Sequence, residues 1–483
     1  MKPSQFINRT SAAKISPVLA VLLCMLLYCQ NPLSAQGKQP VIVNDVSRLN
    51  PIEVSAVITP KTTAEIAEAV KSAKGSVSVG GGRYSMGGQT ATENTLQIDM
   101  RDFNQIIAFN KDQKEITVQA GATWRKVQEH IDPYNLSVKI MQSYANFTVG
   151  GALSVNAHGR YIGMGPIILS VKKIQVVLAS GEIKIASPIE NPDLFFAAIG
   201  GYGGIGVITE ATLQLTDNVK TERSDQVIAI ENYGKYFADN IRNNQKVIFH
   251  NAVIYPNSYK KIRMVSYTET DREITVKDRL IPSDKSYKGG RAAINFVAGF
   301  PGGKWIRQHV LDPIYYYGKP VVWRNYEASH NVMELEPKSR EINTFVLQEY
   351  FVPVNEFDNF YPKMSQILKA HKVNVMNISV RHALPDPGSK LAWARTEVFA
   401  FVLYYRQGKG AKDKTEVKAW TKALIDASLS CSGTFYLPYQ IHASPEQFRK
   451  AYPNATEFFR VKKQYDPAYK FRNKLWDAYY EKE

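Results

Sequence analysis

The chain has 483 residues, which is too many for one hydrophobic core and suits two or more domains. Hydrophobic residues make up 44% and charged residues 22%, a globular composition that excludes disordered and fibrous classes. The net charge of +16 is compatible with a solvated basic surface or with an anionic polymer, lipid surface or substrate. No basic helix or aromatic-interleaved basic stripe is present, so we expect no nucleic-acid partner.

The first 35 residues differ from the rest. Three basic residues precede an uncharged apolar run, residues 15–29, and a small residue, Ala35, follows. This order is typical of an export signal, because the run is shorter than the roughly 20 residues that span a membrane. We predict a signal peptide over residues 1–35 and an exported protein, periplasmic or extracellular. An uncleaved or lipid anchor, with membrane association through the N-terminus, is the alternative.

Cysteine and histidine are sparse. Cys24 and Cys29 lie in the expected signal, which leaves Cys431 alone in the mature chain. An exported protein with one thiol forms no intrachain disulfide. The eight histidines are scattered, with no cluster at metal-ligand spacing, so we predict no structural metal.

The first part of the chain alternates short helices and strands. Thr62 and Glu65 form a capping box in front of an apolar stripe, and Gly75 closes this helix. Further expected helices are residues 123–131 and 192–199. The expected strands are residues 77–79, 96–98, 115–120, 206–215 and the hairpin 171–178 with 182–186.

From about Asp217 the pattern loosens and tyrosine becomes frequent. Strands are expected at residues 344–353, 375–382 and 399–405, with a helix at 361–370, and short helices and turns return at 435–476. This region therefore predicts an α+β cap domain built on an antiparallel sheet. The expected boundaries are 50–217 for the first domain, 218–433 for the substrate or cap domain, and 434–483 for a segment that returns to the first domain.

Two glycine-rich loops lie about seventy residues apart: VGGGRYSMGGQ at residues 79–89 and TVGGALSVNAHG at 148–159. Backbone N–H groups in such loops converge on anions, so a bound dinucleotide is indicated. A third cluster, Gly201 to Gly206, has the G-x-G-x-x-G spacing of a Rossmann site. Rossmann glycines follow a strand and open a helix, whereas these follow a helix and open a strand, which excludes that interpretation.

These segments, in this order, resemble the vanillyl-alcohol-oxidase superfamily of flavoproteins, whose FAD domain is of the p-cresol-methylhydroxylase type. The resemblance rests on GGGRYSMGG, TVGGALSVNAHG and NPDLFFAAIGGYGGIGVITEATLQL. It covers residues 51–217 well and 435–476 moderately. It implies an α+β fold, a two-subdomain FAD-binding domain and FAD as the cofactor.

By the resemblance, the first loop wraps the FAD diphosphate, the second contacts it from the other side, and the end of the second loop runs beneath the isoalloxazine. Many members bind the flavin covalently through a histidine in the first loop. This chain has Tyr84 there and no cysteine in the second loop, so we predict non-covalent FAD. The implied cofactor-binding residues are Gly80, Gly81, Gly82, Arg83, Tyr84, Ser85, Gly87, Thr148, Val149, Gly150, Gly151, Ser154, Asn156, His158, Gly204, Gly206, Ile208 and Tyr436.

The cap motifs LQEYFVP, NVMNISVRHALPD, GTFYLPYQIH and YDPAYKFRNKLW look like the sugar-oxidising branch, which includes aldonolactone, alditol and decaprenylphosphoryl-ribose oxidases. Aldonolactone oxidases carry a Glu-x-Arg pair on a cap strand. Here the pair reads Ser379 and Arg381, so the carboxylate is missing. Tyr436 matches a flavin-contacting tyrosine of the lipid-sugar oxidase, and Tyr439 stands where that enzyme has a lysine.

Alcohol oxidation by flavin needs an acceptor for the hydroxyl proton and a fixed cation or dipole near the reduced ring. We predict Arg381 and Tyr439 as the catalytic residues, with His382 and His442 as other titratable choices. The resulting hypothesis is an FAD-dependent oxidoreductase for a CH–OH group of a sugar- or polyol-like small molecule, with oxygen or a quinone as electron acceptor. The alternatives are a CH–NH-oxidising dehydrogenase, as in cytokinin-oxidising relatives, and a non-catalytic binding protein that kept the fold.

Overall fold

The computed structural model describes residues 41–256 and 258–480. The expected signal peptide, residues 1–35, lies outside these ranges, and residues 41–483 form one compact unit. Within the described ranges, no helix combines the length and apolarity that crossing a membrane requires.

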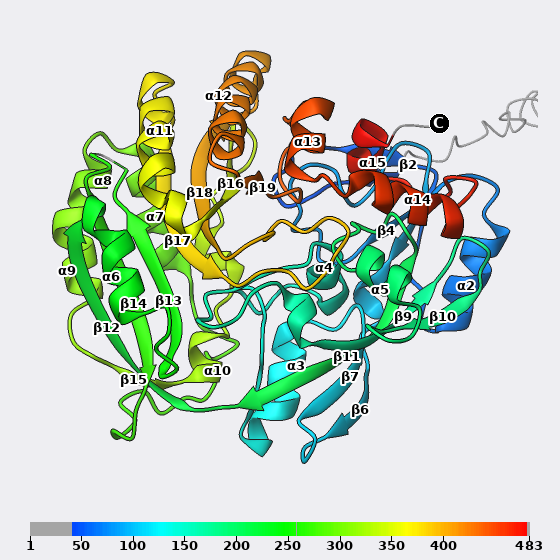
Figure 1. The fold of residues 1–483 in the computed structure, drawn as a ribbon, viewed down its shortest axis with the longest axis horizontal. Coiled ribbons are helices and arrows are strands. Elements are labelled where there is room, and N and C mark those ends of the chain that lie inside the picture. The colour runs from blue at the N-terminus through cyan, green and yellow to red at the C-terminus, as the bar shows by residue number, and fades with distance from the viewer. Residues whose placement is uncertain (1–40, 257, 481–483) are drawn as a thin grey trace, which may run out of the picture. The chain divides into compact units, whose positions relative to one another are not determined.

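Two sheets build the part of the molecule that carries the glycine loops (Figure 1). The smaller is parallel, with the order β3 (Ala56–Ile58), β5 (Leu96–Asp99), β4 (Val77–Gly80). Helix α2 (Thr63–Ser72) connects β3 to β4 and begins where Thr62 Oγ1 accepts a hydrogen bond from Glu65 N at 3.1 Å. A short antiparallel pair, β1 (Val41–Val43) and β2 (Ile52–Val54), precedes it.

The larger sheet is antiparallel and has six strands. Its order is β10 (Ile183–Ala186), β9 (Val171–Val177), β11 (Val207–Asp217), β7 (Glu115–Gln119), β6 (Ile106–Asn110), with β8 (Leu136–Val138) paired to the end of β11. Helices α3 (Trp124–Ile131), α4 (Val149–Ser154) and α5 (Pro192–Ala198) belong to the same part. The third glycine cluster lies between α5 and β11, the helix-to-strand order that the sequence predicted.

An eight-stranded antiparallel sheet, here called the cap sheet, forms the other part. Its order is β15 (Val321–Trp323), β12 (Lys220–Ala229), β14 (Lys261–Glu269), β13 (Val247–Ile254), β17 (Val375–Ala383), β18 (Val398–Gly408), β16 (Asn343–Pro353), β19 (Thr434–Phe435). Helix α6 (Tyr233–Asn240) lies between β12 and β13 in the chain, and α10 (Arg324–Glu327) follows β15. The fold is therefore α+β with an antiparallel cap, as the sequence predicted.

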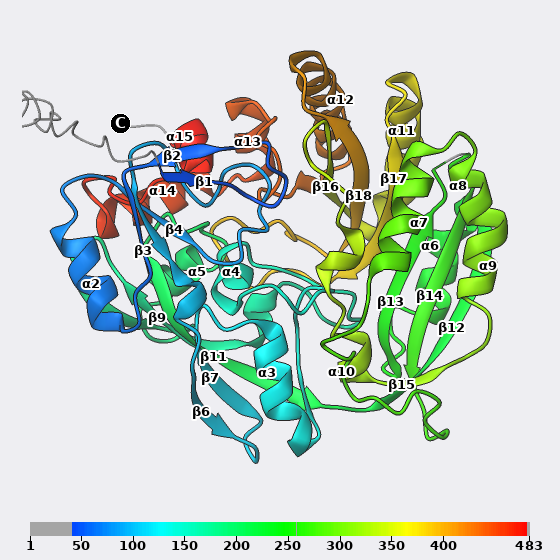
Figure 2. The ribbon, with the colours of Figure 1, turned by 180° about the vertical axis from the view of Figure 1, so that it is seen from behind.

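Side chains alternate between the two faces of the cap sheet because successive residues of a strand point in opposite directions. On one face stand α11 (Phe357–Ala370) and α12 (Ala411–Leu429), side by side in Figures 1 and 2. Phe401 of β18 packs edge-on against Phe360 of α11 at 4.8 Å, and Tyr405 packs against Trp420 of α12 at 4.9 Å. The opposite face is therefore free to line a cavity.

A helical segment is inserted between β14 and β15. It contains α7 (Lys288–Gly299), α8 (Gly303–Ile306), a π-helical turn (Arg307–Leu311) and α9 (Asp312–Tyr315). Figure 2 shows helices α7 to α9 beside strands β12 to β14 of the cap sheet.

The C-terminal segment, α13 (Pro445–Ala451), α14 (Ala455–Tyr465) and α15 (Lys474–Tyr479), packs on the part that carries the glycine loops. Phe471 forms a parallel bridge with Val77 of β4, and Val77 N donates to Lys470 O at 2.7 Å. Trp476 Nε1 donates to Gly201 O at 3.2 Å.

The expected helices and strands are present, with two differences. Helix α11 begins at Phe357 rather than at residue 361, because the structure accommodates Pro362 inside the helix, whereas proline usually occupies the first turn. The elements between residues 218 and 335, which include strands β12 to β15 and helices α6 to α10, and helix α12 were not predicted.

Candidate active site

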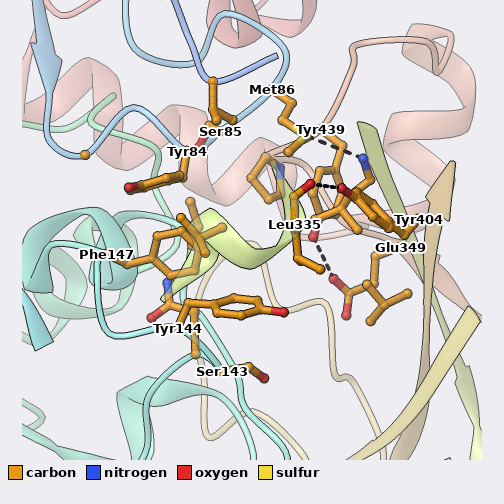
Figure 3. Close-up of a pocket in the computed structure, with 18 of the residues that line it drawn as sticks. Tyr84, Ser85, Met86, Ser143, Tyr144, Phe147, Leu335, Glu349, Tyr404 and Tyr439 are labelled. Carbon is orange, nitrogen blue, oxygen red and sulfur yellow. Dashed lines mark hydrogen bonds between the residues drawn. The ribbon is translucent and has the colours of Figure 1, made fainter. Parts of the chain in front are cut away.

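A cavity of about 660 Å³ lies between the glycine loops and the cap sheet (Figure 3). Most of the predicted site residues line it: Gly81, Gly82, Arg83, Tyr84, Ser85, Thr148, Gly150, Gly151, Ser154, His158, Gly206, Ile208, Arg381, Tyr436 and Tyr439. The two glycine loops, the third glycine cluster and the cap motifs therefore meet at one place. Tyr84 packs edge-on against Phe147, with ring centroids 4.4 Å apart.

The two glycine loops meet at Thr148. Its Oγ1 accepts hydrogen bonds from Gly82 N at 3.4 Å and from Gly151 N at 3.3 Å. A Cβ atom on Gly81 would lie 2.5 Å from the same oxygen, and one on Gly150 would lie 2.6 Å from Ala120 Cβ. Glycine is needed at these positions because the loops approach each other, and the chain beneath them, at backbone distance.

Part of the first loop is prepared for an anion. No described residue accepts a hydrogen bond from the backbone N–H of Arg83, Tyr84 or Ser85. Arg83 has a left-handed backbone (φ 59°), and its buried Nε has no partner, while its other nitrogen donates to Asp99. Free backbone donors in such a turn form an anion-binding concavity. These residues therefore fit the diphosphate of FAD.

Five of the predicted cofactor residues do not line the cavity: Gly80, Gly87, Val149, Asn156 and Gly204. Asn156 is completely buried and joins two loops, since its Nδ2 donates to Asp386 Oδ2 at 2.6 Å and to Ser389 Oγ at 3.1 Å. Val149 is buried in the core, and its N–H donates to Ala122 O.

Close packing accounts for the three glycines. A Cβ on Gly87 would lie 2.2 Å from the carbonyl oxygen of Tyr439, and one on Gly204 would lie 2.4 Å from Trp476 Nε1. A Cβ on Gly80 would lie 2.6 Å from Gln97 Nε2. These glycines allow neighbouring segments to come close to the loops that line the cavity.

A buried carboxylate, Glu349 of β16, joins two of the predicted residues. His158 Nε2 lies 2.5 Å from Glu349 Oε1, and Tyr439 donates its hydroxyl proton to Glu349 Oε2 at 3.1 Å (Figure 3). His158 Nδ1 lies 3.2 Å from Gly159 O, which can only accept, so Nδ1 carries a proton. Each carboxylate oxygen of Glu349 therefore has one hydrogen-bond partner, His158 at Oε1 and Tyr439 at Oε2.

Strand register explains why Glu349 takes the place of the missing carboxylate. Ser379 of β17 pairs with Val402 of β18, and Val402 pairs with Glu349 of β16. Directly paired residues of antiparallel strands point to the same face. A carboxylate is thus present in the same row of the sheet as position 379, two strands away.

Arg381 lies one row further along β17 and lines the same cavity. Burial lowers the pKa of its guanidinium, an effect opposed by the charge of Glu349. Its Nε is buried and has no hydrogen-bond partner among the described residues, and the same holds for Ser143 Oγ, also in the cavity wall. Unpaired buried polar groups are costly unless a ligand or water pairs with them, so this end of the cavity fits a polar ligand.

Burial raises the pKa of both Tyr436 and Tyr439 well above 10, and the charge of Glu349 adds to the shift. Both phenols therefore stay protonated at neutral pH. The other titratable choices lie elsewhere: His382 Nε2 is 2.7 Å from Glu397 Oε1, and neither His382 nor His442 lines the cavity. Burial lowers the pKa of His442 to about 4, so it is neutral at physiological pH.

Sequence reasoning missed Glu349, although it lies inside the quoted motif LQEYFVP. The available signal was a carboxylate in the middle of an otherwise apolar, buried strand. Among the described residues, no group of His, Cys, Asp or Glu side chains is arranged to hold a metal ion.

Residues 54–187 match a family model described as an FAD-binding domain. The chain therefore carries an FAD-binding domain. FAD is the cofactor of this domain, and the free loop N–H groups described above are consistent with its diphosphate.

Curated relatives of this FAD-binding domain include several enzymes. An uncharacterized oxidoreductase of a fasciation locus in Rhodococcoides fascians is 30% identical over 190 residues, 38% of this chain and 43% of the relative. Cytokinin dehydrogenase 2 of Arabidopsis thaliana is 28% identical over 178 residues, 36% of this chain and 35% of the relative. A protein assigned as a D-arabinono-1,4-lactone oxidase of Neurospora crassa is 30% identical over 160 residues, 32% of this chain and 29% of the relative. The match spans less than half of each relative.

Proposed function

We propose that this protein is an FAD-dependent oxidoreductase that oxidises a CH–OH group of a sugar- or polyol-like substrate. The observation that carries the proposal is the buried carboxylate of Glu349, which lies in the cavity wall between His158 and Tyr439. An alcohol must lose its hydroxyl proton as it is oxidised, and this group is placed to receive it. When bound, FAD supplies the hydride acceptor.

The protein's own residues have separate tasks in this proposal. Glu349 accepts the hydroxyl proton, directly or through the phenol of Tyr439, which already donates to it. His158 holds the carboxylate in place through the contact of its Nε2 with Glu349 Oε1. Arg381 offers planar donors to substrate oxygens or to negative charge that develops in the cavity.

The relatives support both the main proposal and its alternative. One relative is assigned to a lactone of a sugar acid, and others are named cytokinin dehydrogenases, which act on a CH–NH group. The sheet motifs of the sugar-oxidising branch and the polar end of the cavity favour CH–OH oxidation. Oxygen or a quinone as electron acceptor, non-covalent attachment of FAD, export and N-terminal membrane association stay predictions.

The test is anaerobic bleaching of the flavin absorbance near 450 nm. Purified protein is loaded with FAD, acid-precipitated in one aliquot to test for covalent flavin, and otherwise mixed with matched panels of sugars, polyols and amines. Bleaching by sugars or polyols, and its absence with the corresponding deoxy compounds, supports the proposal. Bleaching by amines alone overturns it in favour of CH–NH oxidation, and a protein that takes up no FAD overturns the enzyme assignment.

A further inference from the structure

The helical segment between β14 and β15 exposes an unusual number of large apolar side chains. We call them the apolar patch: Phe296, Phe300, Trp305, Val310, Ile314, Tyr315 and Tyr317. Tyr317 is 89% exposed and Ile314 70%. Single exposed apolar residues are ordinary, but a concentration of aromatic and branched side chains in 22 successive residues indicates a surface that something covers.

The run from Gly303 to Tyr315 is amphipathic in the reverse of the usual sense. Trp305, Val310 and Ile314 recur at intervals of five and four residues and face solvent. Asp312 is buried and accepts a hydrogen bond from Tyr255. A helical run that exposes three large apolar side chains while it buries its carboxylate is suited to an apolar neighbour rather than to water.

The segment is also strongly basic. Residues 285–319 contain six lysines and arginines, and Asp312 is their sole carboxylate. Lys288 and Lys319 are exposed and Lys304 is half-buried, and none of the three pairs with a carboxylate of the described chain; the ion pair within this segment joins Arg307 to Asp312. Burial lowers the pKa of Lys304. Unpaired lysines around exposed tryptophan, tyrosine and phenylalanine have the chemistry of an anionic membrane surface: cations against phosphates and aromatic rings at the headgroup boundary.

The inner side of the same segment lines the central cavity. Ala293, Ile294 and Val297 of α7 contribute to the wall, as does Leu311, and Tyr315 of the apolar patch borders the cavity at its edge. The segment therefore separates the cavity from whatever covers the apolar patch.

We propose that residues 288–319 bind the surface of an anionic phospholipid bilayer, with the apolar patch in the interfacial region and the lysines against the headgroups. A second copy of this chain is a less favourable partner for the apolar patch than a bilayer. A symmetric contact would bring two copies of the same basic segment together, and like charges would oppose it. The inference concerns a surface and does not depend on the reaction proposed above.

Trp305 supplies a readout specific to this segment. Of the six tryptophans it is the exposed one, at 55%, and the other five are buried or half-buried. Residues 1–40 contain no tryptophan, so an N-terminal anchor would not mimic the signal. The full-length, FAD-loaded protein is mixed with vesicles whose phosphatidylcholine carries brominated acyl chains, with or without phosphatidylglycerol, and tryptophan fluorescence is measured.

We expect fluorescence quenching with the anionic vesicles, little with pure phosphatidylcholine, and loss of quenching at high salt. Trp305→Phe should remove the quenchable fraction but leave vesicle co-sedimentation intact. The triple variant Lys288→Gln, Lys304→Gln and Lys319→Gln should weaken the vesicle affinity measured by quenching at least tenfold. A control variant, Ile107→Ser with Ile189→Ser, changes exposed apolar residues elsewhere and should not change it.

Two results would overturn the proposal. One is the absence of Trp305 quenching by anionic vesicles under conditions where the protein is folded and holds flavin. The other is concentration-dependent dimerisation that shields Trp305 in the absence of lipid and is lost in the Ile314→Ser variant, which would assign the patch to a second copy.

Discussion

The glycine loops form one half of the cavity and the cap sheet forms the other, and the two halves are built by different means. The loops present backbone N–H groups, and their glycines allow other backbone to come within contact distance. The cap sheet presents side chains, Glu349 and Arg381, from strands that are brought together by pairing. The loop half is built from backbone and tolerates little added volume, whereas the cap-sheet half is built from side chains and tolerates little change of chemistry. Substitutions in the loops should therefore weaken FAD binding, and substitutions in the cap sheet should slow substrate oxidation.

The largest effect is expected for Glu349→Gln. Glutamine keeps the size and one acceptor but cannot take the substrate proton, so the rate of flavin bleaching by substrate should fall by about 10²- to 10⁴-fold. FAD content should be unchanged, because the substitution lies in the cap sheet. Stopped-flow bleaching and the flavin-to-protein absorbance ratio check the two statements, with the surface variant Glu356→Gln as control. Loss of flavin with Glu349→Gln would show that the two halves are not separable.

Arg381→Met should have the next largest effect. Methionine fills similar volume but removes a buried charged donor, so catalytic efficiency should fall by about 10- to 150-fold, the equivalent of one hydrogen bond to a charged group. Partial rescue by Arg381→Lys would indicate that charge matters, and no rescue would indicate that the planar fork matters. Steady-state kinetics with the best substrate of the panel decides between them, and an unchanged efficiency in Arg381→Met would remove Arg381 from the site.

Gly150→Ala tests the half of the cavity that the glycine loops form. Its Cβ would lie 2.6 Å from Ala120 Cβ and 3.0 Å from Ala120 O, and overpacking of this kind costs about 1–3 kcal/mol. Because the strain falls on the second loop, FAD affinity should weaken by roughly 10- to 100-fold, while protein that still holds FAD keeps its bleaching rate. Isothermal titration of the apoprotein with FAD measures the affinity, and stopped-flow absorbance measures the bleaching rate. Gly75→Ala, where nothing lies within 4 Å, is the matched control.

The smallest effect concerns stability where the two halves meet. His330 lies between Glu327, at 3.7 Å, and Glu334, at 3.4 Å, and Arg160 binds Glu327 at 2.8 Å. Although burial opposes it, these carboxylates raise the pKa of His330 to about 9 from 6.5. A raised pKa stabilises the fold below pH 6.5, and this contribution, on the order of 3 kcal/mol, is lost as pH rises through about 9.

His330→Gln should therefore flatten the fall in Tm between pH 6.5 and 9, with the exposed His371→Gln as control. Thermal unfolding in a pH series measures it. An unchanged slope in His330→Gln would mean that the carboxylates do not hold the imidazolium in the folded state.

The difference between the glycine loops and the cap sheet explains which site residues could be predicted from the sequence. Residues 80–85 and 148–151 belong to contiguous motifs, because a backbone turn is determined by neighbouring residues, and most of them line the cavity. Glu349 and Ser379 are thirty residues apart in the chain, and they share a row of the sheet only after β16, β18 and β17 have paired. Because this pairing cannot be read from the sequence, the residues around Arg381 suggested that the site lacks a carboxylate.

Helix α12 escaped prediction for a related reason. Its buried residues include Val417, Trp420 and Leu424, at helical spacing, but polar Thr421 and Ser428 are buried among them. The apolar stripe is therefore broken, and the helix is stabilised by packing on the cap sheet and against α11 rather than by a pattern of its own.

The C-terminal contacts have a consequence for the order of events during synthesis. The loop at Gly87 packs against the carbonyl of Tyr439, β4 is extended by Phe471, and the glycine cluster before β11 is fastened by the buried Lys462 and by Trp476. These partners are made more than two hundred residues after the glycine cluster itself. A growing chain has both glycine loops before it has the contacts that brace them, so FAD loading should wait until these later segments have been made.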